Sequence, residues 1–339
     1  MKIALVQCYD EENFSQYFIT EHIRLFYMAL CDLGCDVIVL TNHYDPSRFN
    51  IFFSVMNATP EFIASFLKEK INYAVYQPEI LMSQGVNVRP ERLPTDPDER
   101  KVDMQEALNG LYVYLKILAN ARLVLEVFPF NQKYLSMYKI KSILFPIGYH
   151  EALENTPEQE KSFDLCFFGA LSSHRQRILN QLIEHGFKFQ LINKRHNFFR
   201  DNILTRTKIN IALPYNTDTM DHISPFRVYT ALYNGCMTLS VSCKKTPSVE
   251  GMLEYIPENM LIERIEQLIA TQSYQAQYTN FKTALKKRPM TKIMRQMLGQ
   301  ISSTIKHNRY AGPAFAQASF DSFEALPSPH IVFNPTSFN

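Results

Sequence analysis

The sequence predicts an α/β protein built from two parallel-sheet domains. Short apolar segments of strand length alternate with amphipathic helical segments in the first half, and the alternation stops and then restarts in the second half. Strands that alternate with helices pair in parallel through right-handed crossovers, so helices cover both faces of each sheet. Because ligands of such sheets bind at the carboxyl ends of the strands, we expect the two domains to face each other across a cleft.

The first half contains a series of segments that we expect to be strands, each short, apolar and followed by turn residues. Between the first two, Ser15 can cap a helix that ends at Gly34, with apolar residues at three- and four-residue spacing. A second helix opens at Thr59-Pro60. The expected strands are residues 3–8, 36–41, 51–56, 73–77, 122–127 and 142–145.

A change in composition marks the expected domain boundary. Residues 146–150 interrupt the alternation, and residues 151–162 are polar and acidic with no apolar period. We therefore expect one domain over residues 1–148 and a second over 149–290. A C-terminal helix and a poorly ordered tail rich in Pro, Ser, Ala and Phe are expected over 291–339.

The alternation restarts after this boundary. The expected strands are residues 164–168, 187–192, 208–213 and 236–241. The expected helices are residues 172–183, 225–234, 247–253 and 263–270, and the long stretch over 274–305 is also expected to be helical.

Composition places the chain among globular proteins. It has 339 residues, 46% hydrophobic and 20% charged, with a formal net charge of +2, so no global attraction to nucleic acid or membrane is visible. The six cysteines are scattered and include no CxxC pair, which favours a reducing cytoplasm over a disulfide framework or a zinc site. No apolar run approaches membrane-spanning length.

The segment from Ser224 to Gly235 combines clear helix boundaries with one misplaced charge. Ser224 is an N-cap residue, Pro225 suits the first helical position, and Gly235 follows the C-terminus. Arg227 is a cation in the first turn, where free N–H groups and the helix dipole favour an anion. A phosphate bound there would explain both features, whereas an arginine that points to solvent or pairs with Asp221 would need no ligand.

Residues 163–241 resemble the nucleotide-sugar-binding domain of GT-B glycosyltransferases. The likeness is closest to the bacterial and phage group of spore-maturation-type and DNA-base glucosyltransferase-like sequences, with a group 1-like C-terminal domain. It rests on an ordered set of three pieces. These are the strand, Gly and Arg of Phe167 to Leu179, the Lys and strand of Thr207 to Leu213, and the Arg, helix and Gly of Arg227 to Gly235.

This resemblance implies two Rossmann-like domains, with residues 1–148 binding the acceptor and 149–290 binding the donor. A nucleotide-diphosphate leaving group needs cations or N–H groups to stabilise its charge, and the chain has no Asp-x-Asp motif for a metal. We therefore expect a site without a metal and without a cofactor. Its expected donor and phosphate ligands are Gly169, Arg175, Lys208, Tyr215, Ser224 and Arg227.

The catalytic base is expected from the N-terminal domain. Asp10 and Glu11 follow the first strand, and His22 lies near the start of the first helix, so all three are candidates to take the acceptor proton. An exposed acidic loop and a structural histidine would give the same sequence pattern without any catalytic role. The resemblance also departs from retaining members, because Ser224 and Thr230 stand where those commonly carry glutamates, and this leaves the stereochemistry open.

The expected function is therefore that of a cytoplasmic hexosyltransferase-type glycosyltransferase, which uses a nucleotide sugar and an acceptor that is a saccharide, protein, lipid or nucleic acid. Two alternatives remain open: a non-catalytic nucleotide- or partner-binding protein of the same fold, and a nucleotide-sugar epimerase. The absence of G-x-S-x-G, Walker and G-x-G-x-x-G motifs argues against a serine hydrolase, a P-loop NTPase and an NAD enzyme.

Overall fold

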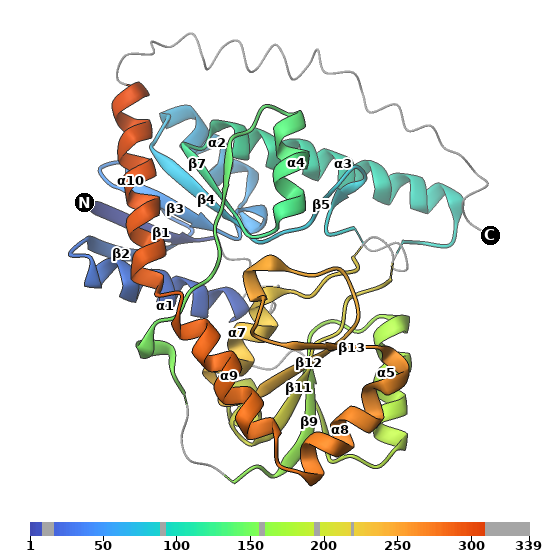
Figure 1. Cartoon of the computed structure of the whole chain (residues 1–339). Coiled ribbons are helices and arrows are strands. Elements are labelled where there is room, and N and C mark those ends of the chain that lie inside the picture. The colour runs from blue at the N-terminus through green and yellow to red at the C-terminus, as the bar shows by residue number, and fades with distance from the viewer. Residues whose placement is uncertain (9–16, 89–92, 156–159, 193–196, 218–219, 309–339) are drawn as a thin grey trace.

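The computed structural model describes residues 1–8, 17–88, 93–155, 160–192, 197–217 and 220–308. These residues form two parallel sheets, one in each half of the chain, which lie at opposite ends of the molecule (Figure 1). We call them the first unit and the second unit.

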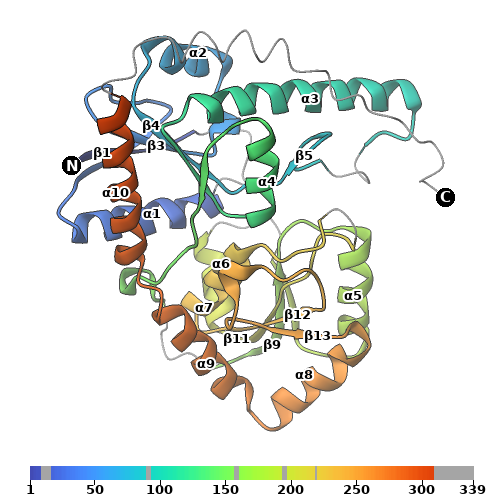
Figure 2. The same cartoon turned by 45° about the horizontal axis from the view of Figure 1, so that its top comes forward.

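The sheet of the first unit has the order β2-β1-β3-β4-β7-β8, and all its pairs are parallel. Its inner strands are buried and largely apolar because helices cover both faces of the sheet. Three helices, α2, α3 and α4, pack on one face, and α1 packs on the other (Figure 2). The strands are β1 (Lys2–Gln7), β2 (Asp36–Thr41), β3 (Phe49–Phe53), β4 (Tyr73–Gln77), β7 (Leu123–Glu126) and β8 (Ser142–Leu144), with a hairpin of β5 (Leu81–Met82) and β6 (Gly85–Val86) beside them. The helices are α1 (Tyr17–Asp32), α2 (Pro60–Glu69), α3 (Pro97–Asn120) and α4 (Pro129–Met137).

The sheet of the second unit has the order β10-β9-β11-β12-β13 and is also parallel. Its strands are β9 (Phe163–Phe168), β10 (Phe189–Ile192), β11 (Thr207–Ile211), β12 (Met237–Val241) and β13 (Glu254–Ile256). Its helices are α5 (Ser173–Glu184), α6 (Asn197–Thr205), α7 (Pro225–Tyr233), α8 (Leu261–Ala270) and α9 (Tyr274–Lys286). The helix expected over 247–253 is wrong. Only a single 3-10 turn forms at Pro247–Val249, and Gly251 at φ +77° then leads into strand β13.

The long stretch expected to be helical over 274–305 forms two helices, which are separated at Pro289. Proline has no N–H to continue a helix. Instead, Tyr149, in the segment that links the two units, inserts between the two helices. Tyr149 N donates to Arg288 O and Met290 N donates to Tyr149 O, each at 2.7 Å. The second helix, α10 (Met290–Asn308), then returns to the first unit and packs along α1 (Figure 1).

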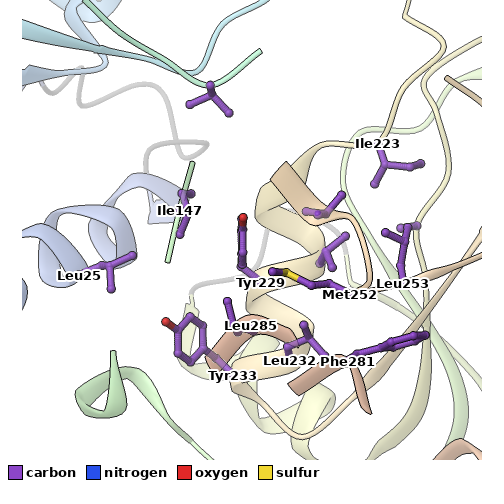
Figure 3. Packing of buried hydrophobic residues seen from close by; sticks show 14 of the residues in the cluster. Leu25, Ile147, Ile223, Tyr229, Leu232, Tyr233, Met252, Leu253, Phe281 and Leu285 are labelled. Atoms are coloured by element: carbon purple, nitrogen blue, oxygen red, sulfur yellow. The ribbon is translucent and has the colours of Figure 1, made fainter. Parts of the chain in front are cut away.

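One hydrophobic core continues from the first unit into the second. Leu25 of α1 and Ile147 of the linker face Tyr229 and Tyr233 of α7 (Figure 3). The Tyr233 hydroxyl donates to Gly148 O at 3.0 Å and accepts from His150 N at 2.9 Å. The two parallel sheets, their covering helices and α10 confirm the predicted fold class of two Rossmann-like parallel-sheet units with C-terminal helices. The residue limits set for the domains stay a prediction, and the tail over 309–339 lies outside the described residues.

Within the part of the chain that the structure describes, no helix combines the length and apolar character needed to cross a membrane.

Candidate functional site

A cavity of about 490 Å³ lies between the two units. Its wall comes from α1 and the loops after β3 and β4 on one side, and from the loops after β9 and β11 and the start of α7 on the other. These loops follow the carboxyl ends of parallel strands, where open α/β sheets bind their ligands. A larger hollow of about 820 Å³ lies between α5 and α8, but none of the predicted site residues line it.

Arg227 and Gly169 meet in the wall of this cavity. Gly169 follows β9 directly and has φ +134°, a conformation that residues with a side chain rarely adopt. A Cβ at this position would lie 2.6 Å from the guanidinium carbon of Arg227. Arg227 Nη1 donates to Leu213 O at 3.2 Å, and the guanidinium lies 5.5 Å from the centre of the Phe167 ring. The glycine therefore makes room for the arginine over the ends of β9 and β11.

Ser224 precedes α7, as the sequence predicts, and lines the same cavity. Its backbone is extended, but its side chain caps no backbone N–H of the helix. Thr59, at the equivalent position before α2, does accept a hydrogen bond from Phe62 N. The start of α7 thus presents a hydroxyl, the positive end of the helix dipole and the Arg227 guanidinium in one wall.

Arg175 is brought to the cavity but is engaged with the protein backbone. The side chain is 4% exposed and donates to the carbonyl oxygens of Ala170, Leu213 and Pro214 at 2.7 to 3.2 Å. Its guanidinium carbon lies 5.0 Å from the centre of the Tyr215 ring. These contacts join the loop after β9 to the loop after β11, so Arg175 positions the two loops that carry the site.

Tyr215 also lies in the cavity wall, held through its backbone. Its carbonyl accepts a hydrogen bond from the Ser172 hydroxyl at 2.5 Å, and the same hydroxyl accepts from Arg175 N at 3.2 Å. Ser172 therefore caps α5 and fixes the Tyr215 loop at once.

Lys208 is not brought to the cavity. It is the second residue of β11, at the amino end of the strand, and its Nζ lies 2.6 Å from Asp164 Oδ1. Because the strands are parallel, their amino ends lie at the opposite edge of the sheet from the cleft. The ion pair is a sufficient reason for a lysine at this position.

On the first unit, His22 lines the cavity from α1. Its ring lies 4.2 Å from Phe226 of α7 and 5.7 Å from Tyr76, and its Nδ1 has no hydrogen-bond partner among the described residues. Burial lowers the pKa of His22 to about 3, so the imidazole is neutral at neutral pH. The other two predicted catalytic residues, Asp10 and Glu11, lie outside the described residues.

Glu79 is a site residue that the sequence analysis missed. It follows β4 after one proline, and among the described residues it is the only carboxylate that lines the cavity. Its Oε2 accepts a hydrogen bond from Asn87 Nδ2 at 2.5 Å. Like Asp10, Glu79 is an acid just past the end of a strand, so the same sequence pattern indicates both residues.

No family model matches the sequence, and no curated protein matches it. Three solved glycosyltransferase structures share its architecture. An alpha-glucosyltransferase in complex with UDP-glucose and DNA containing an abasic site has a TM-score of 0.57 and 10% identity, over 89% of this chain and 99% of that one. The DNA-modifying enzyme beta-glucosyltransferase, solved with and without its substrate UDP-glucose, has a TM-score of 0.56 and 12% identity, over 89% and 100%. AviGT4, a glycosyltransferase of avilamycin A biosynthesis, has a TM-score of 0.53 and 11% identity, over 91% and 98%. The chain therefore has the GT-B fold, as its sequence predicts.

Proposed function

We propose that this protein is a glycosyltransferase that moves a sugar from a nucleotide-diphosphate donor to an acceptor. The proposal rests on the Arg227 guanidinium. This side chain comes from the start of α7, packs against Gly169 and lines the cavity between the units. Donor departure leaves negative charge on the diphosphate, and an arginine beside a helix N-terminus stabilises such a group.

The similar structures suggest which ligands to test first. One is an alpha-glucosyltransferase solved with UDP-glucose and DNA, and another is a DNA-modifying beta-glucosyltransferase solved with UDP-glucose. We therefore propose UDP-glucose as the first donor and DNA as the first acceptor to test. Assignment to hexosyltransferases, membership of the spore-maturation-type group and a cytoplasmic location stay part of the proposal. So does a mechanism without a metal or a cofactor. A fold does not define an activity by itself, which is why the site residues and not the likeness carry the argument.

The proposed donor site has a clear division of roles. Arg227 and Ser224 face the phosphates, while Arg175 and Tyr215 shape the loops around them. Gly169 allows the close approach. Lys208 has no part in donor binding, because its ammonium pairs with Asp164 at the other edge of the sheet.

Isothermal titration of the protein with UDP-, GDP-, ADP- and TDP-sugars tests the proposal. We expect one nucleotide series to bind, Arg227→Ala to abolish that binding, and Lys208→Ala to leave it unchanged as the matched control. No binding across the panel, or full binding by Arg227→Ala, would overturn the donor site.

The same samples separate the two alternatives. Release of nucleotide from a bound donor in the absence of acceptor contradicts a purely non-catalytic binding protein. Interconversion of epimeric donors without acceptor would indicate an epimerase instead.

A further inference from the structure

We propose that Glu79 is the catalytic base, the carboxylate that takes the proton from the acceptor hydroxyl. This inference rests on the proposed function and adds the acceptor side of the reaction to it. Glu79 comes from the first unit and Arg227 from the second, and both line the same cavity. The proposed base and the proposed phosphate ligand therefore come from opposite sides of the cleft, as a transfer between two bound substrates requires.

The segment that carries Glu79 is held by buried polar side chains. Glu79 N donates to Gln77 Oε1 at 3.1 Å, and Glu79 O accepts from Gln77 Nε2 at 3.0 Å and from Asn131 Nδ2 at 2.7 Å. Gln77 and Asn131 are both fully buried. The backbone N–H and C=O of Glu79 are thus both fixed, so the position of its Cα does not depend on a loose surface loop.

Asn87 fixes the carboxylate itself. Its Nδ2 donates to Glu79 Oε2 at 2.5 Å, while its Oδ1 accepts from Ile80 N at 2.8 Å. Asn87 has φ +54°, a left-handed conformation that asparagine tolerates better than most residues. One amide therefore joins the two ends of the β5–β6 hairpin and orients the acid in the cavity wall.

The other titratable side chains in the described cavity wall are worse proton acceptors. Burial lowers the pKa of His22 to about 3 and that of His222 to about 4, which disfavours the imidazolium that a base must become. A carboxylate, by contrast, becomes neutral when it takes a proton.

The step is a direct displacement with inversion at the sugar. The acceptor oxygen forms a bond to the anomeric carbon, and its proton passes to the Glu79 carboxylate. The bond from that carbon to the diphosphate oxygen breaks, and its electron pair leaves with the diphosphate near Arg227.

Hydrolysis of UDP-glucose without acceptor tests this role, because water then replaces the acceptor hydroxyl. We expect Glu79→Gln to slow UDP release by about 100-fold or more, the usual contribution of a general base, while UDP-glucose binds with unchanged Kd. Added formate should restore part of the rate to Glu79→Ala, which a purely structural role does not predict. Glu106→Gln, at an exposed acid on α3, is the matched control and should behave as the wild type.

The outcomes separate this inference from the proposed function. Normal UDP release by Glu79→Gln would overturn the base assignment, and a loss in Asp10→Asn or Glu11→Gln would then move the role to that residue. A protein that binds UDP-glucose without hydrolysing it would also overturn the inference but leave donor binding intact. Loss of UDP-glucose binding in Glu79→Gln would assign Glu79 to the donor site. Failure of the wild type to bind any nucleotide sugar would overturn both.

Discussion

The guanidinium of Arg227 lies against the α-carbon of Gly169, in the space that a side chain would otherwise occupy. The two residues are far apart in sequence and come from the start of α7 and the end of β9. This packing explains why a cation stands in a first helical turn, where the dipole disfavours it. The Leu213 carbonyl, the Phe167 ring and Gly169 hold the side chain over the strand ends, in the wall of the cavity.

Gly169→Ala should weaken donor binding even though it changes no donor ligand. The new Cβ would lie 2.6 Å from the Arg227 guanidinium carbon, so the arginine must move. Loss of a charge-assisted hydrogen bond costs about 1.5 to 3 kcal/mol, which corresponds to roughly a tenfold to hundredfold higher Kd. Titration with UDP-glucose measures this change.

Gly186→Ala is the matched control, because it separates the collision from backbone strain. Gly186 has φ +95°, and a Cβ there would meet no atom within 4 Å. Both variants should lose stability through strained backbone, by about 1 to 3 kcal/mol in urea unfolding. Only Gly169→Ala should lose donor affinity. Equal donor affinity in the two variants would contradict the role assigned to the Gly169–Arg227 packing.

Arg175→Lys and Arg227→Lys should affect different properties, the first the stability of the protein and the second its affinity for the donor. A lysine at position 175 cannot reach the three carbonyl oxygens that the guanidinium joins, so we expect a stability loss on the order of 2 kcal/mol. A lysine at position 227 loses fewer internal contacts, so its main effect should be on UDP-glucose affinity. Urea unfolding and titration on both variants decide between these roles. A stable Arg175→Lys protein with lost donor affinity would make Arg175 a direct ligand.

Much of the fold could be predicted from the sequence because its strands are buried on both faces. Continuous apolar runs such as 73–77 and 236–241 coincide closely with β4 and β12, and Pro225 and Gly235 bracket α7 as predicted. Helix α3 was not predicted, since its buried residues, Leu111 to Leu118, lie only in its second half and no apolar period runs through the first. Local pattern cannot reveal contacts made by distant segments.

The site was predictable in part, for the same physical reason. The sequence indicates Gly169 as a glycine at a strand end, and Arg227 as a cation in the first turn of a helix that Ser224 precedes, and all three residues line the cavity. The end of each strand that faces the cleft can also be predicted, because the carboxyl ends of parallel strands share one edge of the sheet. Once β4 and β11 are placed, this rule excludes Lys208 from the site and includes Glu79. That the Arg175 guanidinium is taken up by three carbonyl oxygens depends on two loops meeting in space, and nothing in the local sequence encodes it.

An ion pair across the two units should hold the cleft in its present arrangement. Arg200 of α6 is 1% exposed and pairs with Glu21 of α1 and with Asp201, and Thr230 Oγ1 of α7 donates to Glu21 Oε2 at 3.2 Å. Removing one partner of a buried pair leaves the other charge uncompensated, so Arg200→Met should cost about 3 kcal/mol in urea unfolding.

A double-mutant cycle tests whether Arg200 acts through Glu21. The cost of Arg200→Met should shrink in a Glu21→Gln background, because the uncompensated carboxylate is then absent. Additive losses would show instead that Arg200 stabilises α6 alone through Asp201.

Glu126, at the end of β7, should make the stability of the protein fall as pH rises. It is fully buried; Oε1 accepts from Phe128 N at 2.8 Å and Asn131 Nδ2 at 3.0 Å, and Oε2 has no partner among the described residues. Burial raises its pKa from 4.5 to about 8.

Between these two pKa values the folded protein keeps a proton that the unfolded chain has lost, so the free energy of unfolding declines by up to about 1.4 kcal/mol per pH unit. Glu126→Gln keeps both hydrogen bonds to Oε1 without a titrating group, so it should match the wild type near pH 4.5 and exceed it at pH 8, by on the order of 4 kcal/mol. Urea unfolding of both proteins across this range measures the difference. A constant difference between the two curves would mean that Glu126 is ionised in the folded protein.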